Sequence, residues 1–310
     1  MSATPGPTEA GAPRVALVTA EVAHAFDVDL GPLLDALAAH GAQAVAADWH
    51  DDAVDWSAFD LVLVRSPWDY HARLDEFLAW ADRAAAVSDL HNPLDVLRWN
   101  TDKRYLDDLA AHEVPTVPTR WCAPGEAEGF AWPDGGEVVV KPTVSAGSRN
   151  TARFDLDDPA ERAAAVEHLT RIGAMGKTAM VQPYVASVDD RGETAVIVID
   201  GTISHGVRKG PMLAPGGEVA SGLFAAEELQ PRTPTADETD AAHRAVAAVE
   251  ARFATVPLYA RVDLIAGADG APVVLELELT EPALFLVLAP DPAQAADAYA
   301  RAALARHTRR

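Results

Sequence analysis

Two predicted strands near the C-terminus constrain this 310-residue chain more than any other feature, because charged and apolar residues alternate along both. Residues 258–266 and 271–280 are separated by a turn at Asp269-Gly270, which is typical of a hairpin. Side chains two positions apart share a face of a strand, so the charged residues of each strand point the same way. These residues are Arg261 and Asp263 on the first strand and Glu276 and Glu278 on the second.

If the hairpin pairs these strands, three carboxylates and one guanidinium converge on one face of a sheet. That packing is repulsive unless cations are present, and clusters of carboxylate oxygens suit Mg²⁺ bridging to phosphate oxygens. We therefore predict that Asp263, Glu276 and Glu278 hold a metal ion. The alternative is a solvated hairpin with alternating charge and no site. In either case we expect three leucines to face the core, namely Leu275, Leu277 and Leu279.

Two lysines elsewhere in the chain can balance these carboxylates. Lys103 lies near the start of a predicted helix at 101–112, where the alternative is an ordinary surface lysine. Lys141 ends the apolar strand 137–141, and the proline after it favours extended geometry at a strand end. The small-residue loop at 145–148 offers N–H groups and hydroxyls to a phosphate. Neither a Walker A sequence nor G-x-G-x-x-G occurs, so P-loop and dinucleotide-binding folds have no support.

Apolar patterning over the whole chain predicts an α/β protein. A stretch containing Asn92-Pro93, at 91–100, is interpreted as a linker that follows a small α/β lobe. The further predicted strands are 14–20, 42–47, 59–65, 178–185, 193–199 and 202–209. The further predicted helices are 31–40, 73–87, 159–172, 236–253 and 292–307.

Composition excludes several classes of protein. The chain has 25 Lys+Arg and 47 Asp+Glu, a formal net charge of −22, which argues against nucleic acid or a membrane surface as partner. The single cysteine, Cys122, permits neither an internal disulfide nor a cysteine-based zinc site. No apolar run reaches the ~18 residues of a membrane span. Residues 1–13 are interpreted as a disordered tail without signal-peptide character, and we expect a cytoplasmic protein.

The order of these motifs resembles the ATP-grasp superfamily over residues 96–290. Residues 100–103 (NTDK) resemble its first nucleotide-binding lysine motif, and 138–142 (VVVKP) resemble the second. The resemblance implies an ATP-grasp fold of α/β and α+β lobes preceded by a pre-ATP-grasp α/β domain. The expected domains are 14–95 and 96–310, the latter with lobes at 96–185 and 186–310.

The resemblance also assigns residues to the nucleotide and the metal. ATP is the expected cofactor, with two Mg²⁺ ions that Mn²⁺ could replace, held at Asp263, Glu276 and Glu278. Many ATP-grasp ligases have Asn where Glu278 stands, so the site carries an extra negative charge. The expected roles are phosphate binding by Lys103, Lys141, Lys209 and the loop residues Ser145, Ala146, Gly147 and Ser148; adenine binding by Gln182, Tyr184 and Val185; ribose binding by Glu193; and catalysis by Arg261, Lys209, Gly147 and Ser148.

A nearer resemblance is to the O-ureido-serine cyclo-ligase group of cycloserine biosynthesis. It rests on residues 65–70 (RSPWDY), 99–106 (WNTDKRYL) and 276–282 (ELELTEP). The first of these follows a buried strand, where loops of open α/β sheets commonly bind ligands. We predict an amino-acid-like substrate, with Arg65 on its carboxylate, Asp69 on its ammonium group, and Trp68 and Tyr70 beside it. The alternative is a proline turn with a packed tryptophan.

The predicted function is ATP-dependent ligation of a carboxylate to a nitrogen through an acyl phosphate. This chemistry needs positioning and charge neutralisation more than a covalent nucleophile. Cyclisation within one molecule and ligation between two molecules both remain open. A phosphotransferase and a non-catalytic nucleotide-binding module are the alternatives from other classes. Family members are often dimers or larger, which the resemblance extends to this chain as a homo-oligomer.

Overall fold

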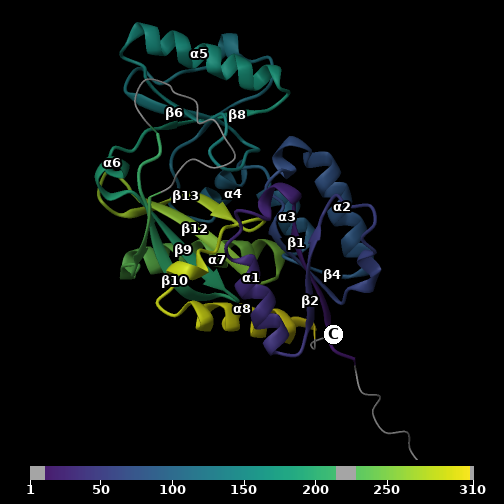
Figure 1. The fold of residues 1–310 in the computed structure, drawn as a ribbon. Coiled ribbons are helices and arrows are strands. Elements are labelled where there is room, and N and C mark those ends of the chain that lie inside the picture. Colours follow the sequence, from purple (N-terminus) through teal and green to yellow (C-terminus); the bar gives the residue numbers. More distant parts are fainter. Residues whose placement is uncertain (1–10, 214–227, 308–310) are drawn as a thin grey trace, which may run out of the picture.

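The computed structural model describes residues 11–213 and 228–307, so the predicted tail at 1–13 lies almost wholly outside it. The described residues form three β-sheets (Figure 1). In this view the sheet formed by strands within residues 120–183 lies at the top, the sheet within residues 193–278 lies below it, and the sheet within residues 14–91 lies to the right. The predicted α/β class is confirmed. Within the described residues, no helix has the length and apolar character needed to span a bilayer.

The first sheet is parallel and contains four strands in the order β2-β1-β3-β4. Its two central strands are consecutive apolar runs, as expected of strands buried on both faces. The interpretation of residues 91–100 as a linker is wrong, because the stretch begins with the last residue of strand β4 and then forms helix α3. Three residues, Asp-Leu-His, carry too little alternation to reveal a strand. The elements are β1 (Arg14–Thr19), α1 (Leu30–Ala39), β2 (Gln43–Asp48), β3 (Leu61–Ser66), α2 (Leu74–Val87), β4 (Asp89–His91) and α3 (Leu94–Asn100).

The predicted helix at 101–112 is shorter, because α4 spans Tyr105–Ala111. The preceding residues make turn contacts instead of helical ones. The backbone N–H of Lys103 donates to the Thr143 carbonyl over 3.0 Å, and that of Arg104 donates to the Asp102 side chain. Lys103 is therefore fixed against the second sheet, and not on a helix surface.

The second sheet is antiparallel, in the order β5-β8-β6-β7, and helix α5 packs on it. Asp158 caps α5 by accepting from the N–H groups of Ala160 and Glu161, and proline occupies the first helical position. The strands β5 and β7 were not predicted, because they are only three and four residues long. The elements are β5 (Arg120–Cys122), β6 (Glu137–Pro142), β7 (Ala152–Asp155), α5 (Pro159–Ala174) and β8 (Ala179–Pro183).

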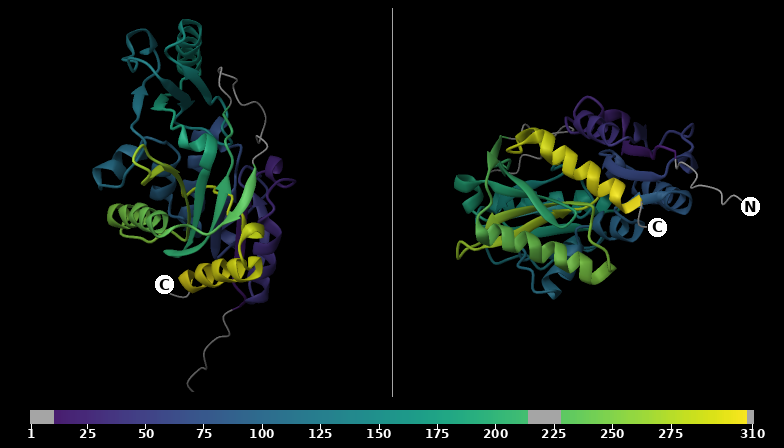
Figure 2. Two further views of the ribbon diagram at one scale, coloured as in Figure 1. Left: turned by 90° about the vertical axis from the view of Figure 1, so that its left-hand side faces the viewer. Right: turned by 90° about the horizontal axis from the view of Figure 1, so that it is seen from below.

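The third sheet is antiparallel, in the order β11-β10-β9-β12-β13, and α7 and α8 lie along it (Figure 2). Alternate residues of β9 pack into two different cores. Ala195 and Ile197 lie with α1 and α8, whereas Val196 and Val198 lie with α7. The elements are α6 (Ser187–Arg191), β9 (Glu193–Ile199), β10 (Thr202–Lys209), β11 (Leu229–Arg232), α7 (Ala236–Phe253), β12 (Tyr259–Ala266), β13 (Pro272–Glu278) and α8 (Pro292–His307).

The predicted pairing of the C-terminal hairpin is confirmed, since Asp263 lies opposite Glu276 and Arg261 opposite Glu278. A β-bulge follows, because the next residue, Leu264, pairs with Val274. Leu275 is the extra residue. It therefore lines the cavity described below instead of the core, which corrects the prediction for that leucine. Leu277 and Leu279 are buried in the core as predicted.

Buried polar side chains within the first 100 residues bind β13 and the chain after it. Asp29, 1% exposed, accepts from the N–H groups of Leu284, Phe285 and Leu286 at 2.7–3.0 Å. Asn100 makes paired bonds with β13, donating to the Leu277 carbonyl and accepting from the Leu279 N–H, both at 2.7 Å. These bonds fix the segment that carries the acidic residues of the cavity.

We expect Asp29→Ala to lower the free energy of unfolding by about 3 kcal/mol, because three buried N–H groups lose their acceptor. Urea denaturation measures this change. Asp35→Ala is the control, since Asp35 is exposed on helix α1, which begins directly after Asp29, and should change the free energy by less than about 0.5 kcal/mol. Equal stabilities of the two variants would contradict the anchoring role of Asp29.

Candidate active site

A cavity of about 490 Å³ is lined by residues of the second and third sheets and by residues 26–29 and Trp68, which follow β1 and β3 of the first sheet. This volume suits a small-molecule ligand. Three of the predicted site residues, Arg65, Asp69 and Tyr70, do not line it. Those that do are Trp68, Lys103, Lys141, Ser145, Ala146, Gly147, Ser148, Gln182, Tyr184, Val185, Glu193, Lys209, Arg261, Asp263, Glu276 and Glu278.

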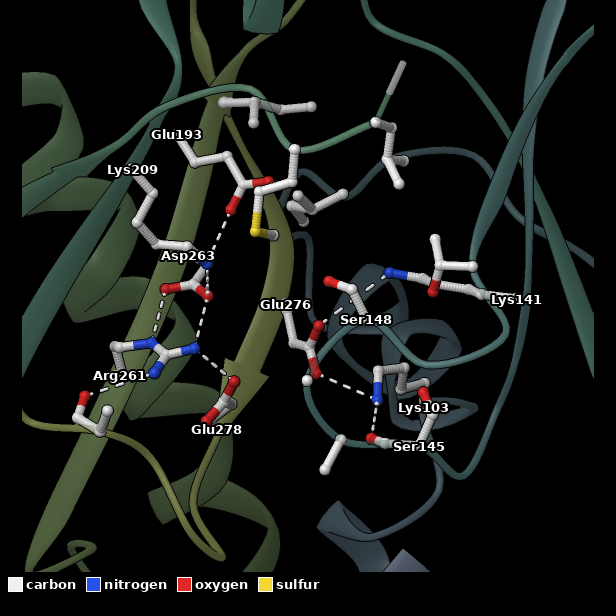
Figure 3. A pocket seen from close by; sticks show the side chains of 18 of the residues that line it. Lys103, Lys141, Ser145, Ser148, Glu193, Lys209, Arg261, Asp263, Glu276 and Glu278 are labelled. Atoms are coloured by element: carbon white, nitrogen blue, oxygen red, sulfur yellow. Dashed lines mark hydrogen bonds and ion pairs between the residues drawn. The ribbon is translucent and has the colours of Figure 1, made fainter. Parts of the chain in front are cut away.

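Asp263 is the centre of a buried charge network on β12 and β10 (Figure 3). Arg261 Nε donates to its Oδ1 and Lys209 Nζ to its Oδ2, each over 2.9 Å. Lys209 also pairs with Glu193 at 2.8 Å, and Arg261 also donates to Glu278. Burial acts to raise the pKa of Asp263, but the charges of Arg261 and Lys209 outweigh it and hold that pKa below its ordinary value.

Glu276 connects the third sheet to two lysines on the side of the second sheet, Lys103 and Lys141. Its Oε1 lies 3.1 Å from Lys103 Nζ and its Oε2 lies 4.0 Å from Lys141 Nζ. Burial lowers the pKa of Lys141, while Glu276 acts in the opposite direction. Lys103 Nζ also donates to the Ser145 carbonyl over 3.0 Å, so it bridges Glu276 and the small-residue loop.

The backbone of the small-residue loop, residues 145–148, adopts a turn that suits exposure of its N–H groups. Gly147 and Ser148 have φ values of 62° and 56°, in the left-handed region. Such a conformation is uncommon for serine and is concentrated at functional sites. Ser145 is buried, whereas Gly147 is exposed.

An apolar slot forms part of the cavity. Gln182, 2% exposed, donates through Nε2 to Thr119 Oγ1 over 3.0 Å, which fixes the orientation of its amide. The Arg153 guanidinium lies 3.5 Å from the centre of the Tyr184 ring and steadies it. The apolar lining consists of Val117, Val139, Val185, Ile265 and Leu275.

The three predicted metal ligands fit Mg²⁺ by chemistry, since all their donor atoms are carboxylate oxygens. Each of them faces a cation of the protein instead of a common centre: Asp263 faces Lys209 and Arg261, Glu276 faces Lys103, and Glu278 faces Arg261. Accordingly, no group of three His, Cys, Asp or Glu among the described residues is arranged as a metal site. Metal binding here requires the carboxylates to exchange these partners.

The predicted substrate contacts of the loop after β3 need correction. Arg65 is completely buried, pairs with Asp27 and donates to the Pro282 carbonyl, so it joins two lobes and cannot contact a substrate. Asp69 accepts from Trp49 Nε1 and Arg73 and is held within the first lobe. Trp68 lines the cavity as predicted.

Glu281 is a cavity residue that the sequence analysis missed. It is 9% exposed, and the Tyr70 phenol hydrogen-bonds to its carboxylate. Burial, followed by the charge of Glu278, raises the pKa of Glu281 to about 8. Glu281 belongs to the segment 276–282 (ELELTEP), which resembles the cyclo-ligase group. It lies after the strand, however, where alternation does not predict the direction of a side chain.

The raised pKa of Glu281 predicts a pH dependence of the ligand-free protein. The folded state holds a proton that the unfolded chain releases near pH 4.5, so the stability contribution of Glu281 falls as pH rises from about 4.5 to about 8. Between pH 6 and pH 8, the free energy of unfolding of the original protein should fall by about 2 kcal/mol more than that of Glu281→Gln. Urea denaturation at both pH values measures this difference, and identical pH profiles would contradict it.

Comparison with known proteins agrees with this architecture. A family model described as the N-terminal domain of D-cycloserine synthetase DcsG matches residues 15–92. The cycloserine biosynthesis protein DcsG of Streptomyces lavendulae is 43% identical over 288 residues, which cover 89% of this chain and 94% of that protein.

Solved structures give the same result. The crystal structure of D-cycloserine synthetase DcsG superposes with a TM-score of 0.87 at 40% identity, covering 95% of this chain and 99% of that one. D-alanine–D-alanine ligase from Bacillus anthracis, at 13% identity, superposes with a TM-score of 0.64 and covers 96% of this chain and 99% of its own. The predicted ATP-grasp fold is therefore confirmed, and the chain belongs to the DcsG family of ATP-grasp ligases.

Proposed function

We propose that this ligase closes a ring within an O-ureido-serine type amino acid, by joining its carboxyl carbon to its own ureido nitrogen at the expense of ATP. The observation that carries the proposal is a cavity in which Lys103, Lys141, Lys209 and Arg261 oppose a set of carboxylates. The substrate class is supported by the DcsG relative, whose name places it in cycloserine biosynthesis.

The first step transfers the γ-phosphoryl group of ATP to the substrate carboxylate and releases ADP. Lys103, Lys141 and Lys209 are proposed to bind the phosphates, with the N–H groups of the loop 145–148. Asp263, Glu276 and Glu278 would hold Mg²⁺, which neutralises phosphate charge. Arg261 then leaves Glu278 and stabilises the negative charge that develops during transfer.

In the second step the ureido nitrogen attacks the carbonyl carbon of the acyl phosphate, the C–N bond forms, inorganic phosphate leaves and the nitrogen releases a proton. The acyl phosphate is open to hydrolysis, so the loop at 145–148 is proposed to close over it and exclude water. The slot beside Gln182, Tyr184 and Val185 is proposed to take adenine, and Glu193 the ribose. Only Trp68 of the residues first predicted for the substrate remains a proposed contact.

The test is turnover with ATP, Mg²⁺ and O-ureido-serine as the only organic substrate. We expect one ADP and one phosphate for each ring product, which mass spectrometry identifies. A requirement for a second amine would indicate ligation between two molecules, and a product that keeps phosphate would indicate a phosphotransferase. Nucleotide binding without turnover would indicate a non-catalytic nucleotide-binding module. The homo-oligomer expected from the family resemblance is measured separately by sedimentation velocity.

A further inference from the structure

Glu281 is a carboxylate that the mechanism above does not use, although it lies in the same cavity. Two residues of the loop after β3 hold it from the opposite lobe. The Tyr70 phenol hydrogen-bonds to its carboxylate, and Trp68 Nε1 donates to its backbone carbonyl over 3.0 Å. Asn100, hydrogen-bonded to Leu279 and Thr280, fixes the chain immediately before it. The position of Glu281 is thus built by several contacts.

The charge balance around Glu281 differs from that of the other acidic residues in the cavity. Six other acidic residues line the cavity. Five of them form an ion pair: Asp27 with Arg65, Glu193 and Asp263 with Lys209, Glu276 with Lys103, and Glu278 with Arg261. The sixth, Asp29, accepts hydrogen bonds from three backbone N–H groups. The hydrogen-bond partner of the Glu281 carboxylate is a neutral phenol. Within residues 11–213 and 228–307, no lysine or arginine forms an ion pair with it, and the charge of Lys103 acts on it only from beyond ion-pair distance. Ionisation of this buried carboxyl group without a nearby cation is costly, so the position favours a ligand that supplies positive charge.

We propose that Glu281, oriented by Tyr70, binds the α-ammonium group of the amino-acid substrate. This inference rests on the proposed function and deepens it. In an α-amino acid the ammonium nitrogen lies only about 2.5 Å from the carboxyl carbon. The ammonium site must therefore adjoin the place where the carboxylate meets the phosphoryl group. Glu281 satisfies this requirement, because it lies three positions after Glu278 and lines the same cavity.

This assignment replaces the one first made from the sequence. Asp69 was predicted to bind the ammonium group, but its carboxylate is occupied by Trp49 and Arg73 outside the cavity. Glu281 has the same chemistry and the required location. A consequence is selectivity, since an analogue without the ammonium group leaves the Glu281 carboxylate buried and unpaired.

The experiment compares O-ureido-serine with its deamino analogue, 3-(ureidooxy)propanoate, in the original protein and in Glu281→Gln. We expect Glu281→Gln to raise KM for O-ureido-serine about 100-fold and to leave KM for ATP within about twofold. The original protein should prefer O-ureido-serine over the analogue about 100-fold in kcat/KM, and the variant less than about tenfold. Tyr70→Phe should raise KM about fivefold, because it keeps the carboxylate and loses only its orienting bond.

Glu76→Gln is the matched control, because the Glu76 side chain is 67% exposed on α2. It should leave both KM values and the preference unchanged. Mg²⁺·ADP binding, measured by calorimetry, separates substrate recognition from metal binding and folding. A Glu281→Gln protein that loses Mg²⁺·ADP affinity as strongly as substrate affinity would overturn the proposal, and so would one that keeps the preference for the ammonium group. Absence of turnover in the original protein would overturn the proposed function as well.

Discussion

Glu278→Ala should lower kcat about 1000-fold, which is the loss expected when a group that stabilises charge in the transition state is removed. Glu278 contributes one of the three proposed Mg²⁺ ligands and one of the two carboxylate partners of Arg261. Without it, Arg261 keeps Asp263 as partner through two hydrogen bonds of 2.9 Å. The guanidinium therefore stays neutralised and the sheet stays intact, so the free energy of unfolding should change by about 1 kcal/mol or less.

Two further variants decide whether Glu278 acts as a metal ligand. Glu278→Asn keeps an oxygen donor and corresponds to the residue common in ATP-grasp ligases, so it should recover most of the activity at high Mg²⁺. Glu167→Ala, at an exposed position of α5, should behave like the original protein. Steady-state kinetics over a range of Mg²⁺ concentrations measures all three variants. Near-normal turnover of Glu278→Ala would remove Glu278 from the site.

The third sheet illustrates what alternation in a sequence can establish. Strands β9, β10 and the paired residues of β12 and β13 follow the predictions closely, because each has a period of two with apolar residues on at least one face. The opposition of Asp263 and Glu276 follows from that pattern and a short turn. The bulge at Leu275 does not follow from it, since a bulge depends on how one strand fits its partner.

Contacts between lobes could not be predicted from local sequence patterns. Arg65 was correctly placed at the end of a buried strand, but its partner carbonyl at Pro282 is 217 positions away. Nothing in residues near Arg65 distinguishes a side chain that joins two lobes from one that meets a ligand. The same limit applies to Glu281, whose direction is set by Tyr70 and Trp68 of another lobe.

The sequence analysis also identified the charged residues of the cavity, but not which of them pair with one another. The acidic residues were expected to share metal ions, whereas in the ligand-free protein they pair with the lysines and the arginine. This follows from electrostatics, because buried charges of opposite sign within reach of one another neutralise each other. The pairing differs between the lysines, and that difference has measurable consequences.

Lys141 is the lysine of the cavity with the weakest compensation. Its side chain is 11% exposed, and its ion pair with Glu276 has an N–O distance of 4.0 Å. Burial lowers its pKa, and Lys103 and Lys209 act in the same direction. In contrast, Lys209 contacts two carboxylates at 2.8 and 2.9 Å. Replacement of a poorly compensated buried charge by an apolar side chain is commonly neutral or stabilising, whereas removal of one partner from a close pair is destabilising.

Lys141→Met should therefore leave the ligand-free protein as stable as before or up to about 2 kcal/mol more stable, while raising KM for ATP about 100-fold. Lys209→Met, the comparison, should lower the free energy of unfolding by about 3 kcal/mol, because Asp263 and Glu193 lose their shared cation. Thermal unfolding with and without Mg²⁺·ADP measures both effects, since stabilisation by a ligand falls with its affinity. A Lys141→Met protein that is destabilised like Lys209→Met, or that keeps its stabilisation by Mg²⁺·ADP, would show that Lys141 has a structural role and is not held in place for phosphate.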